Sequence, residues 1–491
     1  MKKRGKRSTA SALCAFMLVG LLAGCQTAAP KETTKGETPT QTAGTTAQTD
    51  SSQTEAPDDV KEPIELTYWV RASSKENAGK ATIDEFNESQ DRIHVNVESY
   101  GDNYSEVLKL AFNSGEAPDL FMTTGIDLKS YTDAGLVSSL NEYLTDDIKA
   151  EFLPSAFTVN CFDGQVYAIP DQTRFIRLYY NKDLFEKAGL NPDTPPATLE
   201  EMYDMAKQIT EAGDGEFYGF GLPIKSGSTW ERNVDNIAIL GGVTGPCAFD
   251  YTTGRFDFSK QKPILEYFSR MYKEGILMPG SESIDIEVMR ANFVAGKIGM
   301  YLDGNWMVNG YNNEIEGGRD ANWDSDLVPI FEGQERAKDY LMLDSAIAIS
   351  AGCEEKAAAF EAMNYYLHHQ YTSILPSNPD MVQICASLIL DYTAEVNSKP
   401  EVQAMKGING IMKGQEDLAA FPVIPSTQLT LEGDSRDAVY PLLIIQGDSM
   451  DIDKELEALS DTYNAALDNA LAEGLLTEEE IKPEGFDYRT R

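Results

Sequence analysis

Apolar and polar residues alternate along much of the chain in patterns that predict strands separated by helices. From residue 64 to 70 the sequence IELTYWV alternates apolar and polar positions and contains β-branched and aromatic residues, which is typical of a strand. A helix is expected next, with Ile83 and Phe86 on its apolar face. The same pattern predicts strands at 94–98 and 119–122 and a helix over 102–113. This order favours an α/β lobe with a largely parallel sheet.

The alternation continues toward the C-terminus. Thr198 is followed three residues later by Glu201, which forms a capping-box pattern at the start of an amphipathic helix. Gly275 suits the left-handed residue that ends a helix. Further helices are predicted over 259–275, 354–369 and 453–473, and strands over 297–302 and 340–350.

Ligands in open α/β sheets bind beyond the carboxyl ends of the strands. The residues at those positions are Arg71, Tyr100, Gly125 and the run Asp303-Gly304-Asn305-Trp306. The sequence therefore predicts a binding site to which these residues contribute.

The N-terminus has the pattern of a secretory signal. Basic residues come first, and the apolar run over 10–22 is too short to span a hydrocarbon layer of about 30 Å. Leu22-Ala23-Gly24-Cys25 is similar to a bacterial lipobox, so we expect residues 1–25 to be a lipoprotein signal peptide and Cys25 to be lipidated. An ordinary signal peptide with a chance cysteine is the alternative.

Residues 26–63 are rich in Thr, Ser, Gln, Pro and Ala and contain no aromatic residue, Leu or Ile. Such a segment cannot bury enough apolar surface to fold, so we expect a disordered tether with a root-mean-square reach of about 30–35 Å. A lipid anchor followed by a long tether predicts a protein at the extracytoplasmic face of the plasma membrane, in a Gram-positive-type cell.

The net charge of −38 excludes most nucleic-acid binding, because the surface repels phosphate. The three histidines show no metal-ligand spacing, so neither a metal nor a cofactor is expected. Four cysteines remain beyond the signal, namely Cys161, Cys247, Cys353 and Cys385. Their wide spacing leaves open whether they form one or two disulfides or stay as thiols.

Several segments, in order, carry a family resemblance. They are GEAPDL at 115–120, LYYNKDLFEKAGL at 178–190 and FVAGKIGM at 293–300, which leads into Gly304-Asn305-Trp306. Behind a lipobox, they resemble the family 1 extracellular solute-binding proteins, a group that includes maltose-binding protein and many Gram-positive sugar-binding lipoproteins. The likeness covers roughly residues 64–475.

The resemblance implies a two-lobed α/β fold with a ligand cleft between the lobes. Lobe 1 would comprise 64–172 and about 340–390, and lobe 2 would comprise 173–339 and about 391–491. Hinge closure around an oligosaccharide would present a monomeric binding protein, rather than an enzyme, to the permease subunits of an ABC importer.

A sugar site needs aromatic planes for the ring faces and polar side chains for the hydroxyls. The tryptophan of the family motif, Trp306, is expected to stack on a sugar ring, with Asp303 and Asn305 at hydroxyls. Trp230 is a second candidate platform. Each tryptophan could instead be a core residue, and Asp303 or Asn305 could cap a turn. Tyr100, Tyr179 and Asp344 are further predicted contacts.

Two arginines add positive charge to the predicted site. Arg71 follows the first strand, and Arg174 lies where the chain should cross between lobes, close to Asp171, also a predicted contact. The maltose-binding relative has a ligand-contacting carboxylate near the position of Arg174, so this chain departs from the family pattern. Because Arg binds carboxylates through paired hydrogen bonds, we hypothesise an acidic, uronate-containing oligosaccharide. The alternative is that each arginine pairs with a nearby aspartate.

Two rival functions remain at this point. Organic anions, peptides and polyamines are bound by similar two-lobed importer proteins. A secreted glycosidase would also need aromatic residues and paired carboxylates, and only turnover of the sugar distinguishes it from a binding protein.

Overall fold

A computed structural model describes residues 62–71, 76–101, 103–343, 345–370, 374–375, 378–414, 418–421 and 423–487, all within the compact unit Lys61–Arg491. The predicted signal peptide (1–25), with its lipidation site Cys25, lies outside the described residues, as does the tether up to residue 61. Asp344 lies outside them too.

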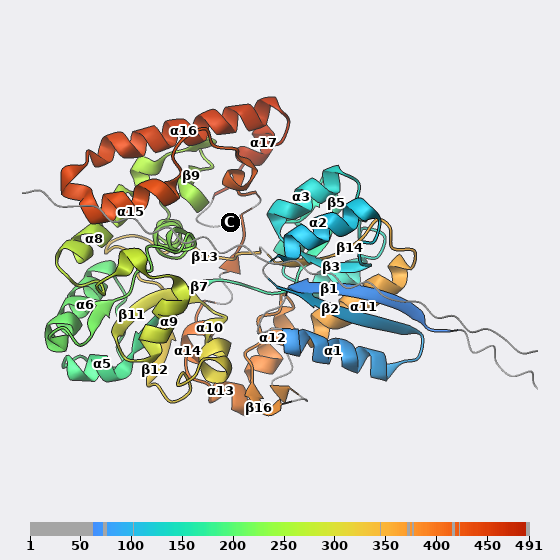
Figure 1. Ribbon diagram of the computed structural model, residues 1–491, viewed down its shortest axis with the longest axis horizontal. Coiled ribbons are helices and arrows are strands. Elements are labelled where there is room, and N and C mark those ends of the chain that lie inside the picture. Colours follow the sequence, from blue (N-terminus) through green and yellow to red (C-terminus); the bar gives the residue numbers. More distant parts are fainter. Residues whose placement is uncertain are drawn as a thin grey trace, which may run out of the picture. The chain divides into compact units, whose positions relative to one another are not determined.

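The first sheet has the strand order β2-β1-β3-β14-β6 (Figure 1). Its strands are β1 (Ile64–Arg71), β2 (Ile93–Tyr100), β3 (Leu120–Thr123), β6 (Ala168–Pro170) and β14 (Ala346–Ile349). β1 pairs in parallel with β2 and β3, and β14 runs antiparallel to β3 and β6. The predicted strands and the largely parallel arrangement are confirmed.

Helices cover both faces of this sheet (Figure 1). On one face lie α1 (Glu76–Ser89) and α11 (Lys356–His369), and on the other α2 (Tyr104–Ser114) and α3 (Gly125–Asp133). Ile83 and Phe86 are buried beneath α1, as their spacing predicts. The same half also contains α4 (Asp146–Glu151), η1 (Pro154–Phe157), β4 (Cys161–Phe162) and β5 (Gln165–Val166).

The second sheet has the order β12-β7-β11-β8. Its strands are β7 (Ile176–Asn181), β8 (Tyr218–Phe220), β11 (Ile298–Gly304) and β12 (Trp323–Asp326). Every side chain of β7 and of β11 is buried, because helices pack on both faces. The fold is thus a two-lobed α/β architecture, as expected.

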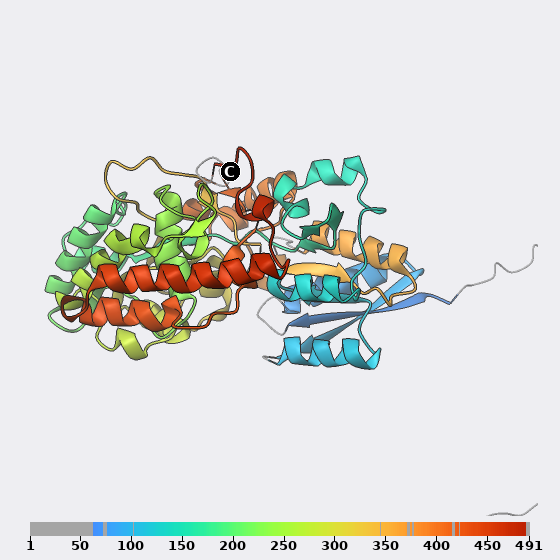
Figure 2. The same ribbon diagram turned by 90° about the horizontal axis from the view of Figure 1, so that it is seen from above.

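The helices predicted after Thr198, over 259–275 and over 453–473 are present as α6 (Leu199–Gly213), α8 (Lys262–Lys273) and α16 (Ile452–Ala472). The second half also contains α5 (Lys182–Lys187), α7 (Asn236–Leu240), α9 (Ile286–Val294), α10 (Met307–Asn309), α14 (Ile408–Met412), α15 (Arg436–Gln446) and α17 (Glu478–Ile481). The capping box of α6 is present in both directions between Thr198 and Glu201. Figure 2 shows the long helix α16 lying beside α15.

Three extended segments pass between the two sheets side by side. The amide of Met342 donates to the carbonyl of Arg174 (2.8 Å), and the amide of Thr173 donates to the carbonyl of Ala386 (2.6 Å). The segments around Thr173, Met342 and Ala386 are therefore hydrogen-bonded into one connecting layer.

The prediction of a single strand over 340–350 is wrong. The chain forms β13 (Asp339–Tyr340), then crosses between the sheets, and only then enters β14. β13 pairs with β17 (Leu418–Ala419), whereas β14 belongs to the first sheet. The crossing is as apolar as the strands that flank it, so the hydrophobic pattern alone could not separate them.

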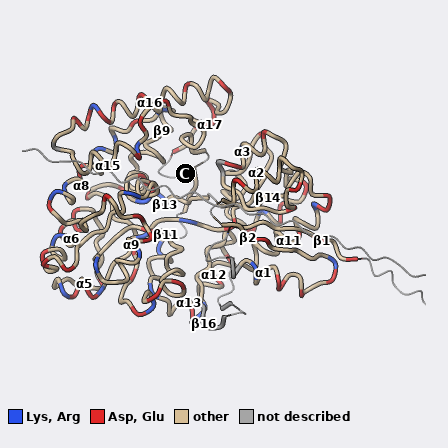
Figure 3. Tube along the Cα trace, viewed as in Figure 1, with Lys and Arg blue, Asp and Glu red and all other residues tan. Residues whose placement is uncertain are grey.

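Acidic residues are spread over the helices of both halves, with basic residues between them (Figure 3). In the part of the chain that the structure describes, no helix has the length and apolar character needed to cross a membrane. Nor do any three His, Cys, Asp or Glu side chains of those residues gather as metal ligands. Cys161, Cys247, Cys353 and Cys385 are all free thiols, which answers the open question of disulfides.

Candidate ligand-binding cleft

A hollow of 480 Å³ lies between elements of the two halves, beside the connecting layer. We call it the Trp306 hollow. From the first half it is lined by Arg71, Tyr104, Ser105, Leu108, Met122, Thr123, Thr124, Asp127 and Tyr131. From the second half it is lined by Glu287, Arg290, Trp306, Met307, Asn309, Gly310, Glu314 and Ile315, and near the connecting layer by Gln172, Arg174, Ser345 and Gln383. Its size and mixed lining suit a small-molecule site.

Trp306 follows directly on the end of β11 and is partly exposed. The glycine of the motif fixes its orientation, since a Cβ at Gly304 would lie 2.0 Å from Cζ3 of the indole. The guanidinium of Arg174 lies over the indole, 4.2 Å from the ring centroid, and that of Arg232 lies 5.8 Å away. One wall of the hollow is therefore both aromatic and cationic.

Arg71 lies at the carboxyl end of β1, on the opposite side of the hollow. Its side chain is exposed, donates to the hydroxyl of Ser105 (3.3 Å) and lies 5.8 Å from the ring of Tyr104. Among the described residues, no carboxylate forms an ion pair with Arg71. Its charge is therefore available to a ligand.

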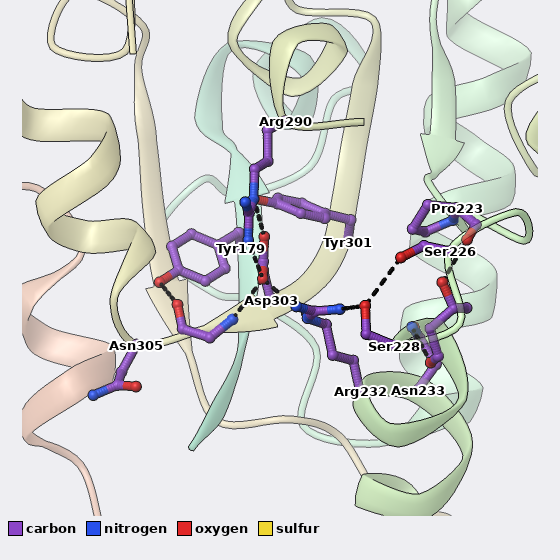
Figure 4. A network of polar contacts seen from close by, with 12 residues as sticks. Tyr179, Pro223, Ser226, Ser228, Arg232, Asn233, Arg290, Tyr301, Asp303 and Asn305 are labelled. Carbon is purple, nitrogen blue, oxygen red and sulfur yellow. Dashed lines mark hydrogen bonds and ion pairs between the residues drawn. The ribbon is translucent and has the colours of Figure 1, made fainter. Parts of the chain in front are cut away.

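Asp303 is fully buried at the centre of a polar network (Figure 4). Arg290 binds both of its oxygens, through Nε (2.8 Å) and Nη2 (3.1 Å). Arg232 approaches the same carboxylate with Nε at 3.2 Å from Oδ1, while its Nη1 donates to Ser228. Asp303 does not line the hollow but positions Arg290, which does.

Charge decides the ionisation state of this network. Burial alone raises the pKa of Asp303, but the positive charges of Arg232 and Arg290, with hydrogen bonds from Arg290 and Gly304, hold that pKa below its ordinary value. Burial raises the pKa of the neighbouring Tyr301 well above its ordinary value. Asp303 is thus a carboxylate, and Tyr301 is a neutral phenol, at any physiological pH.

Asn305 is buried and joins β11 to the connecting layer. Its Nδ2 donates to the carbonyl of Thr173 (3.0 Å), and its Oδ1 accepts from the amide of Phe175 (3.2 Å). The backbone amide of Asn305 also donates to the carbonyl of Phe175 (2.9 Å). These bonds hold Trp306 at a fixed place next to Arg174.

Of the predicted contacts, Trp306, Arg174 and Arg71 come together at the hollow, and the other described ones do not line it. Trp230 is 1% exposed and packs against Tyr440. Tyr179 is buried and donates to the carbonyl of Gly304 (2.7 Å). Tyr100 donates to Glu98 (2.8 Å). Asp171, 1% exposed, lies in the connecting layer, where its amide donates to Ser345 (3.2 Å).

Several lining residues escaped the sequence analysis. Thr124 follows β3 and caps α3 by accepting from the amide of Asp127, so the strand-end rule came within one residue of it. Tyr131 lies inside a helix, and Gln383 lies in a segment without regular structure. No local pattern could have found those two, because only the fold brings them to the hollow.

A second hollow of 670 Å³ borders the same connecting layer. We call it the Asn160 hollow. Its lining includes Asn160, Cys161 and Phe162 from the first half, Met342 and its neighbours from the connecting layer, and Glu231, Asp235, Phe421, Arg436, Glu479 and Glu480 from the second.

Solved structures share this fold. One is an ABC substrate-binding protein from Listeria monocytogenes in complex with cycloalternan, with a TM-score of 0.62 and 17% identity over 84% of this chain and 100% of that chain. Another is the sugar-binding protein MalE from Xanthomonas citri, with a TM-score of 0.63 and 16% identity over 84% of this chain and 100% of that chain. The likeness shows that this chain has the same two-lobed fold.

Residues 71–372 match the family model described as bacterial extracellular solute-binding protein, which is more than half of the chain. The chain belongs to this family, as its motifs indicated, and the family is one of extracellular binding proteins rather than enzymes.

Curated relatives match this chain over part of its length. The maltotriose-binding protein of Pyrococcus abyssi (strain GE5 / Orsay) is 23% identical over 325 residues, covering 65% of this chain and 64% of the relative. The sn-glycerol-3-phosphate-binding periplasmic protein UgpB of Rhizobium meliloti (strain 1021) is 32% identical over 177 residues, covering 34% and 39%. The chain thus matches less than two thirds of the length of either relative.

Proposed function

We propose that this protein is the substrate-binding component of an ABC importer and captures an oligosaccharide in the Trp306 hollow. The observation that carries the proposal is the placing of Trp306. Its partly exposed indole lies between the halves of a solute-binding fold, with hydroxyl and amide groups of both halves around it. Stacking on an aromatic plane with surrounding hydrogen-bond donors is the chemistry that a sugar ring requires.

The two relatives described above bind, by their names, maltotriose and sn-glycerol 3-phosphate. A third relative, 24% identical over 255 residues, is the galactooligosaccharide-binding protein of Bacillus subtilis (strain 168). Two of these three names specify oligosaccharides, which supports the ligand class.

The ligand that fits best carries an acidic group. Arg71, from the first half, and Arg174, from the connecting layer, both line the Trp306 hollow, and an arginine binds a carboxylate or phosphate through paired hydrogen bonds. A uronate-containing oligosaccharide satisfies both the arginines and Trp306. A small organic phosphate is the second candidate, favoured by the same arginines and by the glycerol-phosphate-binding relative.

The mode of action follows from the two-lobed fold. Lobe 1 (64–172 and about 340–390) and lobe 2 (173–339 and about 391–491) close around the ligand by bending of the connecting layer, and the closed monomer docks on the permease. Lipidation of Cys25 and the tether of residues 26–63 would keep the body close to the membrane while allowing it to reach that partner.

A thermal-shift screen of the purified protein tests this proposal. The panel contains maltotriose, trigalacturonic acid, sn-glycerol 3-phosphate and spermidine. A ligand at 100 times its Kd adds about 2.7 kcal/mol to the free energy of unfolding, so a ligand raises the Tm clearly. We expect the largest rise with trigalacturonic acid.

A rise in Tm with maltotriose alone would support an oligosaccharide ligand and contradict the hypothesis that the ligand is acidic. A rise only with glycerol phosphate or spermidine would contradict the proposal. The double variant Arg71→Gln, Arg174→Gln is the matched control, because it should abolish the response to the acidic sugar and leave a response to a neutral sugar.

A further inference from the structure

We propose that the Asn160 hollow is a second compartment of the same ligand site and takes uncharged sugar units. The protein would then select oligosaccharides long enough to occupy both hollows. This inference rests on the proposed function and adds the length and charge distribution of the ligand to it.

The two hollows adjoin each other. Thr124, at the start of α3, lines both of them. Arg174 lines the Trp306 hollow and Met342 lines the Asn160 hollow, and these two residues are joined by the hydrogen bond from the amide of Met342 to the carbonyl of Arg174 (2.8 Å). In this proposal a chain of sugars extends past Thr124 from one hollow into the other.

Each hollow has a buried polar group that lacks a hydrogen-bond partner in the part of the chain that the structure describes. In the Asn160 hollow it is Nδ2 of Asn160, a residue 1% exposed. The Trp306 hollow has two such groups, the hydroxyl of Tyr131 and Nε2 of Gln383, and these residues are 4% and 6% exposed. Leaving such a group unsatisfied destabilises the protein, and a hydrogen bond to a ligand oxygen would offset that cost. Small rotations of these side chains would turn their polar atoms toward the ligand.

The chemistry of these groups selects the ligand. The Nδ2 of Asn160 and the Nε2 of Gln383 are donors, so they need oxygen acceptors such as hydroxyls. The apolar side of a sugar ring would meet Tyr340 and Phe421, whose rings lie 5.4 Å apart at the Asn160 hollow. A polyamine could not satisfy these donors, since its nitrogens are protonated.

The charged residues of the two hollows determine which hollow receives the acidic end of the ligand. Glu231, Asp235, Glu479 and Glu480 line the Asn160 hollow, together with one cation, Arg436, which is paired with Asp235 at 2.5 Å. The Trp306 hollow is lined by three arginines, Arg71, Arg174 and Arg290, and by three carboxylates, Asp127, Glu287 and Glu314. A carboxylate on the ligand would therefore be repelled less in the Trp306 hollow, where three arginines balance three carboxylates, than in the Asn160 hollow, where one arginine faces four carboxylates.

Calorimetric titration with malto-oligosaccharides and galacturono-oligosaccharides of three and six units tests the inference. We expect the wild-type protein to bind maltohexaose about tenfold or more tightly than maltotriose, since the longer chain reaches the second hollow. Hexagalacturonate should gain less over its trimer, because its added units carry charge.

Two variants and a control locate the effect. Asn160→Leu should remove the length gain and leave the Kd of maltotriose unchanged, whereas Gln383→Leu should weaken both lengths about tenfold. Asn236→Leu is the control, because Asn236 is also buried with an unpartnered amide oxygen but lines neither hollow. It should change neither Kd.

Equal Kd values for maltotriose and maltohexaose in the wild-type protein would overturn the inference while leaving the proposed function intact, and this comparison needs no variant to fold. The inference would also fail if Asn160→Leu weakened both lengths equally, or if spermidine displaced maltohexaose. Absence of binding for every oligosaccharide would overturn the proposed function and the inference together.

Discussion

Single residues of the cleft illustrate what a sequence motif does and does not reveal. Trp306 was found because it ends a recognisable run after a strand, and the structure places it in a hollow between the halves. Asp303 and Asn305 belong to the same run but are buried. Their partners, Arg290, Arg232 and Thr173, are distant in sequence, so no local pattern could show that their polar atoms are already occupied.

Asp303 supports a prediction about stability. Asp303→Asn removes the negative charge between Arg290 and Arg232, which leaves the buried Arg232 without its carboxylate and Arg290 with Glu287 alone. We expect the free energy of unfolding at pH 7 to fall by about 3–5 kcal/mol, measured by urea denaturation. Asp193→Asn is the matched control, because Asp193 pairs with Lys182 while 76% of its side chain is exposed. That change should cost no more than about 1 kcal/mol.

A comparison of wild type with Asp303→Asn at several pH values tests the lowered pKa of Asp303. Because its folded pKa is lowered, the stabilisation is present above the unfolded pKa of about 3.9 and is lost as the pH falls through the folded value. The difference between wild type and Asp303→Asn should be constant from pH 7 to about pH 5 and shrink below pH 4. A difference that does not change with pH would show that the carboxylate charge contributes nothing.

Elements were predicted better than side-chain roles, because burial on one face imposes a period on the sequence. The alternating segment 64–70 is a half-buried strand, and the capping box at Thr198 begins a helix. The prediction of one strand over 340–350 was wrong, because a buried crossing segment is apolar in the same way as a buried strand. Which segments pass between the sheets is set by the fold and not by a local pattern.

The junction between β11 and the connecting layer gives a prediction at this scale. Asn305→Ala removes the hydrogen bonds to Thr173 and Phe175 and leaves two buried backbone groups unsatisfied. We expect a loss of about 1–3 kcal/mol in the free energy of unfolding and weaker binding of oligosaccharide, since Trp306 is no longer held next to Arg174. The exposed Asn191→Ala, which removes bonds to Thr194 and Asp193, is the control and should lie within about 0.5 kcal/mol of wild type.

An Asn305→Ala protein as stable as wild type, measured in the same urea titration, would show that the junction is not held by this side chain. Weaker binding without a loss of stability would instead assign Asn305 to direct contact with the ligand, as its sequence position first indicated.

At the scale of the whole molecule, the order of motifs along the chain was enough to predict the two-lobed fold and the family, which the family match confirms. The ligand could not be derived in the same way. Its chemistry depends on Arg71, Arg174, Tyr131 and Gln383, which come from four separate segments and meet only when the halves are assembled.

Binding of an oligosaccharide over Trp306 is measured by calorimetric titration of wild type, Trp306→Ala and Trp323→Phe with maltotriose and trigalacturonic acid. Trp323 is a buried core residue, 2% exposed, and serves as the control. Stacking of the sugar on Trp306 predicts the same Kd for wild type and Trp323→Phe, and an affinity lower by about 30-fold or more for Trp306→Ala. Equal Kd values for wild type and Trp306→Ala, or no heat of binding with either sugar, would contradict it.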